Sequence, residues 1–282
     1  MKQFPLKLGA GFTLPGDVAP FERTAEWLRE QKFSGVMIGF DPTWSDEETE
    51  RVGASFADRG ISIYEVAAYT SLIHEDAETR RDNIDRVKRK IEQASIVGAR
   101  CVATVGGSAA GWAPHPATRS EASWQLLLDA TREILDMTPD HVTFCLEPWP
   151  PTVLPDLESL TRVIQEVGSE RLGILYDPAN LVTPETYFTT GELIHEAFER
   201  LGDRFIAVHC KDISWLMDGM QTGLGETVPG RGVLDYDTFL NRVASAATEL
   251  PLIIEHLKDP EDVLEAASFI RQRARELHLS IS

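Results

Sequence analysis

Four mostly apolar segments of the chain each end in a side chain that can bind a metal ion. The segments are 141–147, 172–177, 204–209 and 251–255, and they end in Glu147, Asp177, His209 and Glu255. Long apolar runs are typical of parallel strands that are covered on both faces. Pro148 has no N–H to donate, so the first of these strands should end near Glu147. The pattern predicts that all four side chains lie at the carboxyl ends of buried strands.

Each of the four residues also has a structural interpretation. A carboxylate at a strand end often caps the next helix, and a lone histidine in an apolar strand is often a hydrogen-bonded core residue. However, three acids crowded together without a cation would repel one another and raise their pKa values. One divalent ion removes that repulsion. The oxygen-rich ligand set favours Mn²⁺, Mg²⁺ or Co²⁺, with Zn²⁺ as an alternative.

The elements that must position these side chains alternate regularly between strand and helix. The expected strands are 7–12, 34–40, 61–68, 100–105, 141–147, 172–177, 204–209 and 252–255. The expected helices are about 18–31, 45–60, 76–97, 120–137, a segment from about 156, 190–201, a segment after 233, and about 260–278. This alternation predicts an α/β fold, a single (β/α)8 TIM barrel domain over residues 1–282, with the catalytic groups at the carboxyl ends of the strands. A doubly wound sheet needs a glycine-rich fingerprint after its first strand, and the stretch after Gly9-Ala-Gly11 lacks the third glycine.

Further polar and aromatic residues are candidates for substrate binding. Lys211 follows His209 by two residues, so it either meets a substrate oxyanion or forms a salt bridge with Asp212. Arg231 stands between two glycines and either clamps substrate oxygens or is solvated. It belongs to the stretch 211–233, which we expect to be irregular and to act as a lid.

Aromatic residues near the expected strand ends could form walls of the site. Trp112 and His115 lie in a loop at 108–118, above the mouth of the predicted barrel. Trp149 and Trp215 offer apolar faces for a ligand, with packing as the alternative role. Glu65 either points into the barrel or is a solvated strand residue.

The bulk composition excludes several classes of function. Of the 282 residues, 45 are acidic and 27 are basic, which gives a net charge of −18 and disfavours nucleic-acid binding. The three cysteines, Cys101, Cys145 and Cys210, are far apart and lie in apolar segments, so we expect buried free thiols in a reducing compartment. No apolar run is long enough for a membrane span or a signal peptide. We therefore expect a cytoplasmic protein with a small-molecule partner, and a homo-oligomer remains open.

The chain resembles the sugar phosphate isomerase/epimerase superfamily, the xylose isomerase-like barrels. The resemblance rests on Glu147, Asp177-Pro-Ala-Asn180, His209-Cys-Lys211-Asp212, the segment 229–236 and Glu255-His256, and on the segment 68–74. It implies that Glu147, Asp177, His209 and Glu255 bind the metal, and that Glu147 and Glu255 are the acid–base pair. It also implies an isomerase or epimerase that abstracts a proton next to the carbonyl of a keto sugar or polyol, through a metal-stabilised enediolate.

Three other functions fit the same resemblance. A dehydratase or lyase, similar to inosose dehydratase or eliminating from a 3-keto glycoside, would use the same site. An endonuclease IV-like phosphodiesterase needs extra histidines, whereas the third and fourth strands end in Tyr69 and Gly106-Gly107. A barrel that binds metabolites without turnover is the third. The chain also departs from ketose 3-epimerases, with Asn180 and Val153 in place of a histidine and a second glutamate. Asn180 is retained as a substrate-binding candidate.

Overall fold

Eight parallel strands close into a barrel in the computed structural model, which describes residues 3–11, 20–218 and 221–282. Around the barrel the strands follow the order β1, β10, β7, β6, β5, β4, β3, β2, and closure is made by the pairing of β1 with β2 and β10. Their bounds are β1 (Lys7–Ala10), β2 (Gly35–Ile38), β3 (Ser62–Ala67), β4 (Cys101–Val105), β5 (Thr143–Glu147), β6 (Leu172–Tyr176), β7 (Phe205–Cys210) and β10 (Pro251–Ile254). The predicted (β/α)8 barrel is confirmed.

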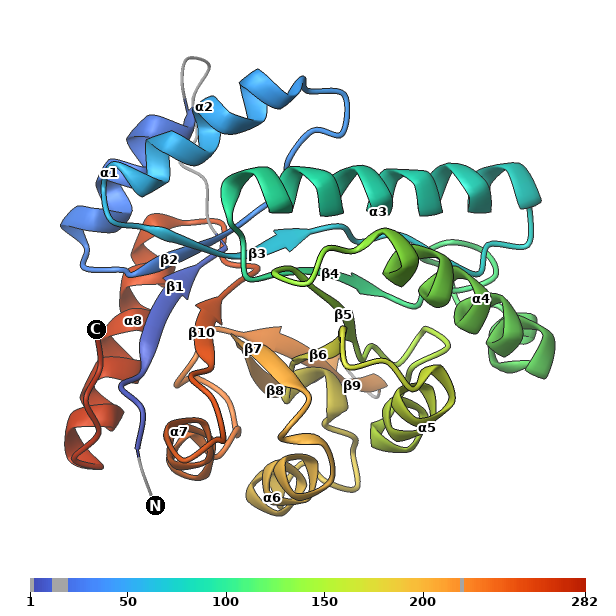
Figure 1. Ribbon diagram of the computed structural model, residues 1–282. Helices are drawn as coiled ribbons and strands as arrows, with labels where there is room; N and C mark the ends of the chain where they lie inside the picture. Colours follow the sequence, from blue (N-terminus) through green and yellow to red (C-terminus); the bar gives the residue numbers. More distant parts are fainter. Residues whose placement is uncertain (1–2, 12–19, 219–220) are drawn as a thin grey trace.

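Over the described residues, eight α-helices surround the strands (Figure 1). They are α1 (Pro20–Glu30), α2 (Asp46–Ala57), α3 (Ala77–Val97), α4 (Glu121–Met137), α5 (Leu157–Val167), α6 (Thr190–Leu201), α7 (Tyr236–Ala244) and α8 (Pro260–Glu276), with 3-10 turns at Pro116–Arg119 and Ala179–Leu181. The expected strand end at Phe12 and the helix start at 18–19 lie outside the described residues. Within the described part of the chain, no helix has the length and apolarity that a bilayer crossing needs.

Local sequence signals set the helix ends where they were predicted. Ser45 caps α2: its hydroxyl accepts from the Glu48 backbone N–H, and the Glu48 carboxylate accepts from the Ser45 N–H. Gly98 ends α3 at a φ of 66°, a left-handed conformation that glycine adopts without a Cβ penalty. Asp156 caps α5 through the Ser159 N–H. These caps fix where each helix returns the chain to the barrel.

The core has two layers, and the inner one sets the floor of the site. The larger layer lies between strands and helices, and a second apolar cluster fills the barrel interior. That inner cluster includes Cys145, Leu175, Ala207 and Ile253. Because side chains alternate between the faces of a strand, the residue two positions later also points inward. The four metal-competent residues stand at those later positions. Cys101, Cys145 and Cys210 are buried free thiols, as predicted.

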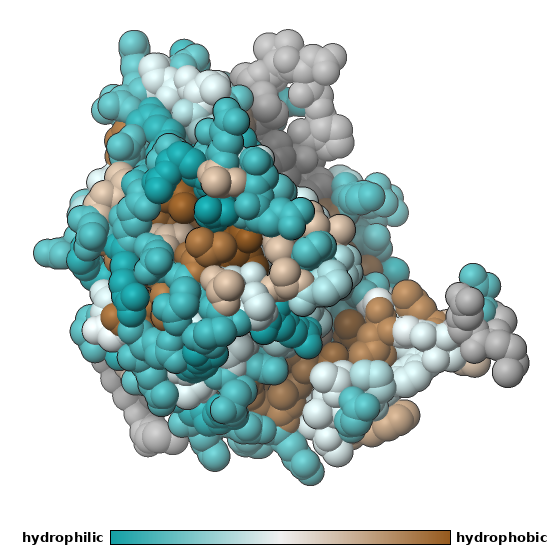
Figure 2. All heavy atoms as spheres, turned by 90° about the vertical axis from the view of Figure 1, so that its right-hand side faces the viewer, coloured by the Kyte–Doolittle hydropathy of each residue, from teal (hydrophilic) through white to brown (hydrophobic). Residues whose placement is uncertain are grey.

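The stretch expected to be irregular contains a β-hairpin, so this part of the prediction is wrong. Strand β8 (Asp212–Asp218) pairs antiparallel with β9 (Gln221–Thr227). Glycines are depleted in strands, which concealed β9 in the sequence. At Gly225 a Cβ would lie 2.3 Å from Leu216 Cδ1, so the missing side chain lets Leu216 cross the hairpin. The hairpin forms the arm that projects from the body in Figure 2, with Leu216 and Met217 exposed.

Candidate active site and metal centre

The four predicted ligands converge at the carboxyl ends of four neighbouring strands. Glu147 ends β5, Asp177 follows β6, His209 lies in β7 and Glu255 follows β10. One ligand atom from each residue lies within 4.8 Å of every other, and all four side chains are buried. These strands are consecutive in the barrel order β5, β6, β7, β10, so their ends meet at one side of the mouth. The geometry therefore places three carboxylates and one imidazole around a single point.

Three atoms of this cluster are buried and have no hydrogen-bond partner: Asp177 Oδ2, His209 Nδ1 and Glu255 Oε1. The last two lie 2.7 Å apart, but the contact does not have hydrogen-bond geometry. An unsatisfied buried polar atom costs about 1–3 kcal/mol, more when it is charged. A divalent cation between these atoms would satisfy all three at once. The residues present therefore fit a metal ion.

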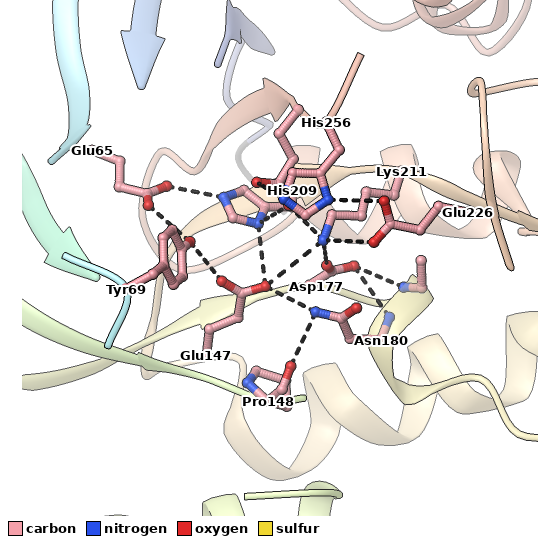
Figure 3. Close-up of polar contacts among 12 residues, drawn as sticks. Glu65, Tyr69, Glu147, Pro148, Asp177, Asn180, His209, Lys211, Glu226 and His256 are labelled. Carbon is pink, nitrogen blue, oxygen red and sulfur yellow. Dashed lines mark hydrogen bonds and ion pairs between the residues drawn. The ribbon is translucent and has the colours of Figure 1, made fainter. Parts of the chain in front are cut away.

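Other carboxylate oxygens of the predicted ligands accept hydrogen bonds from neighbouring residues. Asp177 Oδ1 accepts from the backbone N–H groups of Ala179 (2.9 Å) and Asn180 (3.3 Å), which directs Oδ2 toward the cluster. Asn180 Nδ2 donates to Glu147 Oε1 (2.9 Å) and to the Pro148 carbonyl oxygen (3.1 Å). Asn180, predicted to bind substrate, thus also orients a predicted ligand. Figure 3 shows these contacts together.

Lys211 lies inside the cluster. Its Nζ is 2.7 Å from Asp177 Oδ2, 2.7 Å from Glu255 Oε1 and 4.0 Å from Glu147 Oε1, and the side chain is buried. The ammonium offsets carboxylate charge, although it makes no hydrogen bond of regular geometry to the first two oxygens. Lys211 is the only cation among the described residues that touches Asp177. The ammonium therefore stands beside the oxygens that a metal ion would use.

The alternative salt bridge between Lys211 and Asp212 is wrong, because the Asp212 carboxylate is used elsewhere. This buried carboxylate accepts backbone N–H groups from Ile213, Gly230, Gly232 and Leu234. A Cβ at Gly232 would lie 2.2 Å from Asp212 Oδ1, so only glycine fits there. Asp212 is thus the structural anchor of the loop after β9.

The surroundings shift the pKa values of the two predicted catalytic glutamates in opposite directions. Burial raises the pKa of Glu147 above its usual value, and His209 and Lys211 only partly oppose this. Burial also acts to raise the pKa of Glu255, but the charges of His209 and Lys211 outweigh it and lower that pKa. For His209, burial is outweighed by Glu255, Glu147 and Glu65, so its pKa is raised well above the usual range. Such divergence between two carboxyl groups is typical of acid–base pairs.

A cavity of about 260 Å³ opens above the cluster. Two of the predicted ligands, Glu147 and Glu255, line it. Four of the residues predicted near the site also line it: Trp112, Trp149, Asn180 and Lys211. The other lining residues are Tyr69, Val105, Glu226 and His256. The rings of Trp112 and Trp149 meet edge to face with centroids 5.7 Å apart. Cavities that hold drug-sized ligands start at about 300 Å³, so this one suits a small molecule.

Two cavity residues, Glu226 and His256, were given no role in the site from the sequence. His256 Nδ1 lies 2.8 Å from Glu226 Oε2, and Glu226 Oε1 lies 3.4 Å from Lys211 Nζ. His256 directly follows Glu255, which was a usable signal, and its φ of 60° is unusual for a residue with a Cβ. Glu226 reaches the cavity only through the hairpin, so the sequence held no comparable signal.

Three other candidates are not among the residues that line the cavity. The Arg231 guanidinium binds Glu265 and Asp262 on α8, at the surface. His115 caps the 3-10 turn Pro116–Arg119 through its Nδ1 and is not part of the cavity wall. Trp215 packs on Tyr187, with ring centroids 5.3 Å apart.

Comparison with known proteins identifies the family. The family model described as xylose isomerase-like TIM barrel matches residues 25–273. The chain belongs to this family. Inosose dehydratase from Geobacillus thermodenitrificans (strain NG80-2) is 23% identical over 172 residues, which are 54% of this chain and 55% of that protein. The match thus spans about half the length of this curated relative.

Solved structures of the same fold include a magnesium complex and an epimerase. A xylose isomerase-like TIM barrel protein from Mycobacterium smegmatis, in complex with magnesium, has a TM-score of 0.70 and 17% identity, covering 97% of this chain and 96% of that one. The 3-keto-D-glucoside 4-epimerase from E. coli has a TM-score of 0.71 and 16% identity, covering 95% and 99%. At these identities the likeness shows the shared fold.

Proposed function

We propose that this family member is a divalent-metal-dependent isomerase or epimerase of a keto sugar or related polyol. The observation that carries the proposal is the trio of buried ligand atoms without a hydrogen-bond partner, next to a cavity whose lining includes Glu147 and Glu255. Glu147, Asp177, His209 and Glu255 would hold the ion. When bound, a divalent ion acts as a Lewis acid that polarises a carbonyl oxygen. Mn²⁺, Mg²⁺ or Co²⁺ suits this set of three carboxylates and one imidazole, and Zn²⁺ is the alternative.

The protein's own groups would carry the proton. Glu255, whose pKa is lowered, is ionised and suited to remove a C–H proton next to the carbonyl. Glu147, whose pKa is raised, is suited to hold a proton and return it. The Lys211 ammonium faces the same cavity and would stabilise negative charge that develops on a substrate oxygen. Return to the opposite face of the same carbon gives an epimer, and return to the neighbouring carbon gives an isomer.

The cavity walls support a sugar or polyol. The Trp112 and Trp149 rings offer apolar faces for the C–H side of a sugar ring. Asn180, Glu226 and His256 offer polar groups for hydroxyls. A phosphodiesterase is disfavoured, because Tyr69 and Gly106 stand after β3 and β4 where additional histidine ligands would be needed.

A dehydratase or lyase is the second candidate. Abstraction of the same proton followed by loss of a neighbouring hydroxyl or glycosidic oxygen would eliminate water or an alcohol, with Glu147 protonating the leaving oxygen. The partial similarity to an inosose dehydratase favours this outcome over the remaining alternatives.

Solvent deuterium exchange tests the proposal without knowledge of the physiological substrate. Ketopentoses, ketohexoses, inososes and 3-keto glycosides would be incubated in D₂O with Mn²⁺ or Co²⁺, and label and product followed by NMR and mass spectrometry. We expect deuterium or product at the carbon next to the carbonyl, lost with chelator and in Glu255→Gln. Arg231→Gln, remote from the cavity, is the matched control and should behave as wild type. If the whole panel gives neither label nor product, the enzymatic proposal is overturned in favour of a metabolite-binding barrel.

A further inference from the structure

Glu65 is a fully buried carboxylate inside the barrel that the proposed chemistry does not use. It lies in β3 and is paired in register with Cys101 of β4. Its Oε2 lies 2.9 Å from Nε2 of His209, whose side chain is also completely buried (Figure 3). Burying a carboxylate is expensive unless the charge has a specific partner. The only nitrogen that the described residues bring to Glu65 Oε2 is His209 Nε2.

The contact determines which ring nitrogen of His209 carries a proton. A carboxylate accepts hydrogen bonds, so Nε2 must donate to Glu65. In a neutral imidazole the other nitrogen, Nδ1, then has a free lone pair. Nδ1 is the atom that faces the cluster, 2.7 Å from Glu255 Oε1 and 3.5 Å from Glu147 Oε1, without a hydrogen bond. Glu65 therefore orients the ring and, once the second ring proton is lost, leaves the Nδ1 lone pair available.

Tyr69 extends this arrangement to a second predicted ligand. Its hydroxyl lies 3.0 Å from Glu65 Oε1 and 2.6 Å from Glu147 Oε2. Glu65 and Tyr69 are four positions apart on the inward-facing side, so both point into the barrel. One phenol thus ties Glu147 to the carboxylate that holds His209.

We propose that Glu65, assisted by Tyr69, is a positioning residue that selects Nδ1 of His209 as the metal-binding atom. The inference rests on the metal site of the proposed function but concerns two residues outside the ligand set. Outer carboxylates of this kind raise metal affinity about 10–100-fold. The competing role, a core ion pair that only stabilises the fold, predicts no specific effect on metal binding.

Metal affinity, measured by competition with a chelator, separates the two roles. We expect Glu65→Leu to bind Mn²⁺ or Co²⁺ about 10–100-fold more weakly than wild type. Glu65→Gln should retain most of the affinity, because its amide oxygen can still accept from Nε2. Tyr69→Phe should show a smaller loss than Glu65→Leu. The visible spectrum of bound Co²⁺ should change in Glu65→Leu. Val66→Ala, a buried change on the opposite face of β3, is the control for lost stability and should bind normally.

A double-mutant cycle and a measurement on the wild type complete the test. If Glu65 acts through His209, Glu65→Leu should add no further loss in a His209→Ala background. Wild-type protein with ¹⁵N-labelled histidine and bound ¹¹³Cd²⁺ should show coupling to Nδ1 of His209; coupling to Nε2 would overturn the inference whether or not the variants fold. Equal affinity of Glu65→Leu and wild type would also overturn it while leaving the metal site intact. A wild type that binds no metal would instead overturn the metal site itself, and this inference with it.

Discussion

The Nζ atom of Lys211 lies 2.7 Å from Oδ2 of Asp177, and both side chains are buried. This ammonium and a divalent ion would share the same carboxylate. Lys211 is therefore the counter-ion of the metal-free cluster, and burial, which lowers its pKa, is outweighed by Asp177 and Glu255, which raise it. Charge balance in the metal-free cluster consequently depends on this lysine together with His209.

Replacement of Lys211 should lower the stability of the metal-free protein and increase the stabilisation that added metal produces. In Lys211→Met we expect the free energy of unfolding, measured with chelator present, to fall by about 3–5 kcal/mol, because removing one partner of a buried ion pair leaves uncompensated charge. Added Mn²⁺ should raise the melting temperature more than in wild type, since no ammonium competes. Arg231→Met, which breaks a surface pair, should leave the free energy of unfolding close to that of the wild type. Equal metal-induced shifts in wild type and Lys211→Met would contradict this account.

Metal binding should release a proton and tighten as the pH rises. The pKa of His209 is raised above its usual value in the metal-free cluster, so near neutral pH the imidazole holds a proton that the ion must displace. Affinity should increase with pH until that pKa is passed. Calorimetry in buffers of different ionisation enthalpy should report net proton release, absent in His209→Ala. Asp177→Ala should bind metal poorly by elemental analysis, compared with about one ion per wild-type chain. A pH-independent affinity without proton release would refute the assignment.

The two glutamates should separate ligation from proton transfer. Glu147→Gln and Glu255→Gln keep side-chain shape but remove a carboxylate, so both should fold and bind metal less tightly. Even at saturating metal, the turnover number should fall by at least about 10²–10⁴, the usual contribution of a general base. The readout is the turnover number on whichever substrate the exchange screen identifies. A variant that keeps near-wild-type turnover under these conditions is not a proton carrier.

Lys90 should make the free energy of unfolding increase with pH in the alkaline range. Burial lowers the pKa of Lys90 to about 8 from 10.5, and its Nζ donates to the Ala67 carbonyl oxygen at the end of β3. Between those values the unfolded chain holds a proton that the folded chain has lost, so stability should rise with pH across this window. The contribution is at most about 1.4 kcal/mol per pH unit. In urea unfolding, the free energy of unfolding of Lys90→Met should not show this rise with pH. If the difference in that free energy between the variant and the wild type is the same at pH 8 and at pH 10.5, the prediction is wrong.

The barrel and its four strand-end side chains could be predicted because short-range patterns determine them. The apolar runs, the alternation of inward-facing residues and Pro148 after the end of one strand can all be recognised in short stretches of the sequence. The direction of Glu65 could not be predicted in the same way. A shift of one residue in strand register reverses which side chains face inward, and the segment 61–68 permits either register.

The features that the sequence did not reveal depend on partners that are distant in the sequence. Arg231 was a candidate either for clamping substrate oxygens or for a solvated position, and nothing around residue 231 indicates that Glu265 and Asp262 on α8 bind it. Glu226 enters the cavity only because β9 pairs with β8 and His256 binds its carboxylate. Such contacts depend on tertiary packing rather than on local propensity.

The β8–β9 hairpin has a consequence for how this scaffold can diversify. Its two ends, Asp212 and Thr227, lie opposite each other in register, and Asp212 anchors the following loop through backbone N–H groups. The hairpin is thus a module with adjacent ends, whereas the candidate ligands come from barrel strands outside it. Because the two ends are held in place, we expect changes in the outer part of the hairpin, beyond Asp212 and Glu226, to leave those ligands in position. If the proposed function holds, the preference for one substrate over another could then change while the candidate metal centre stays the same.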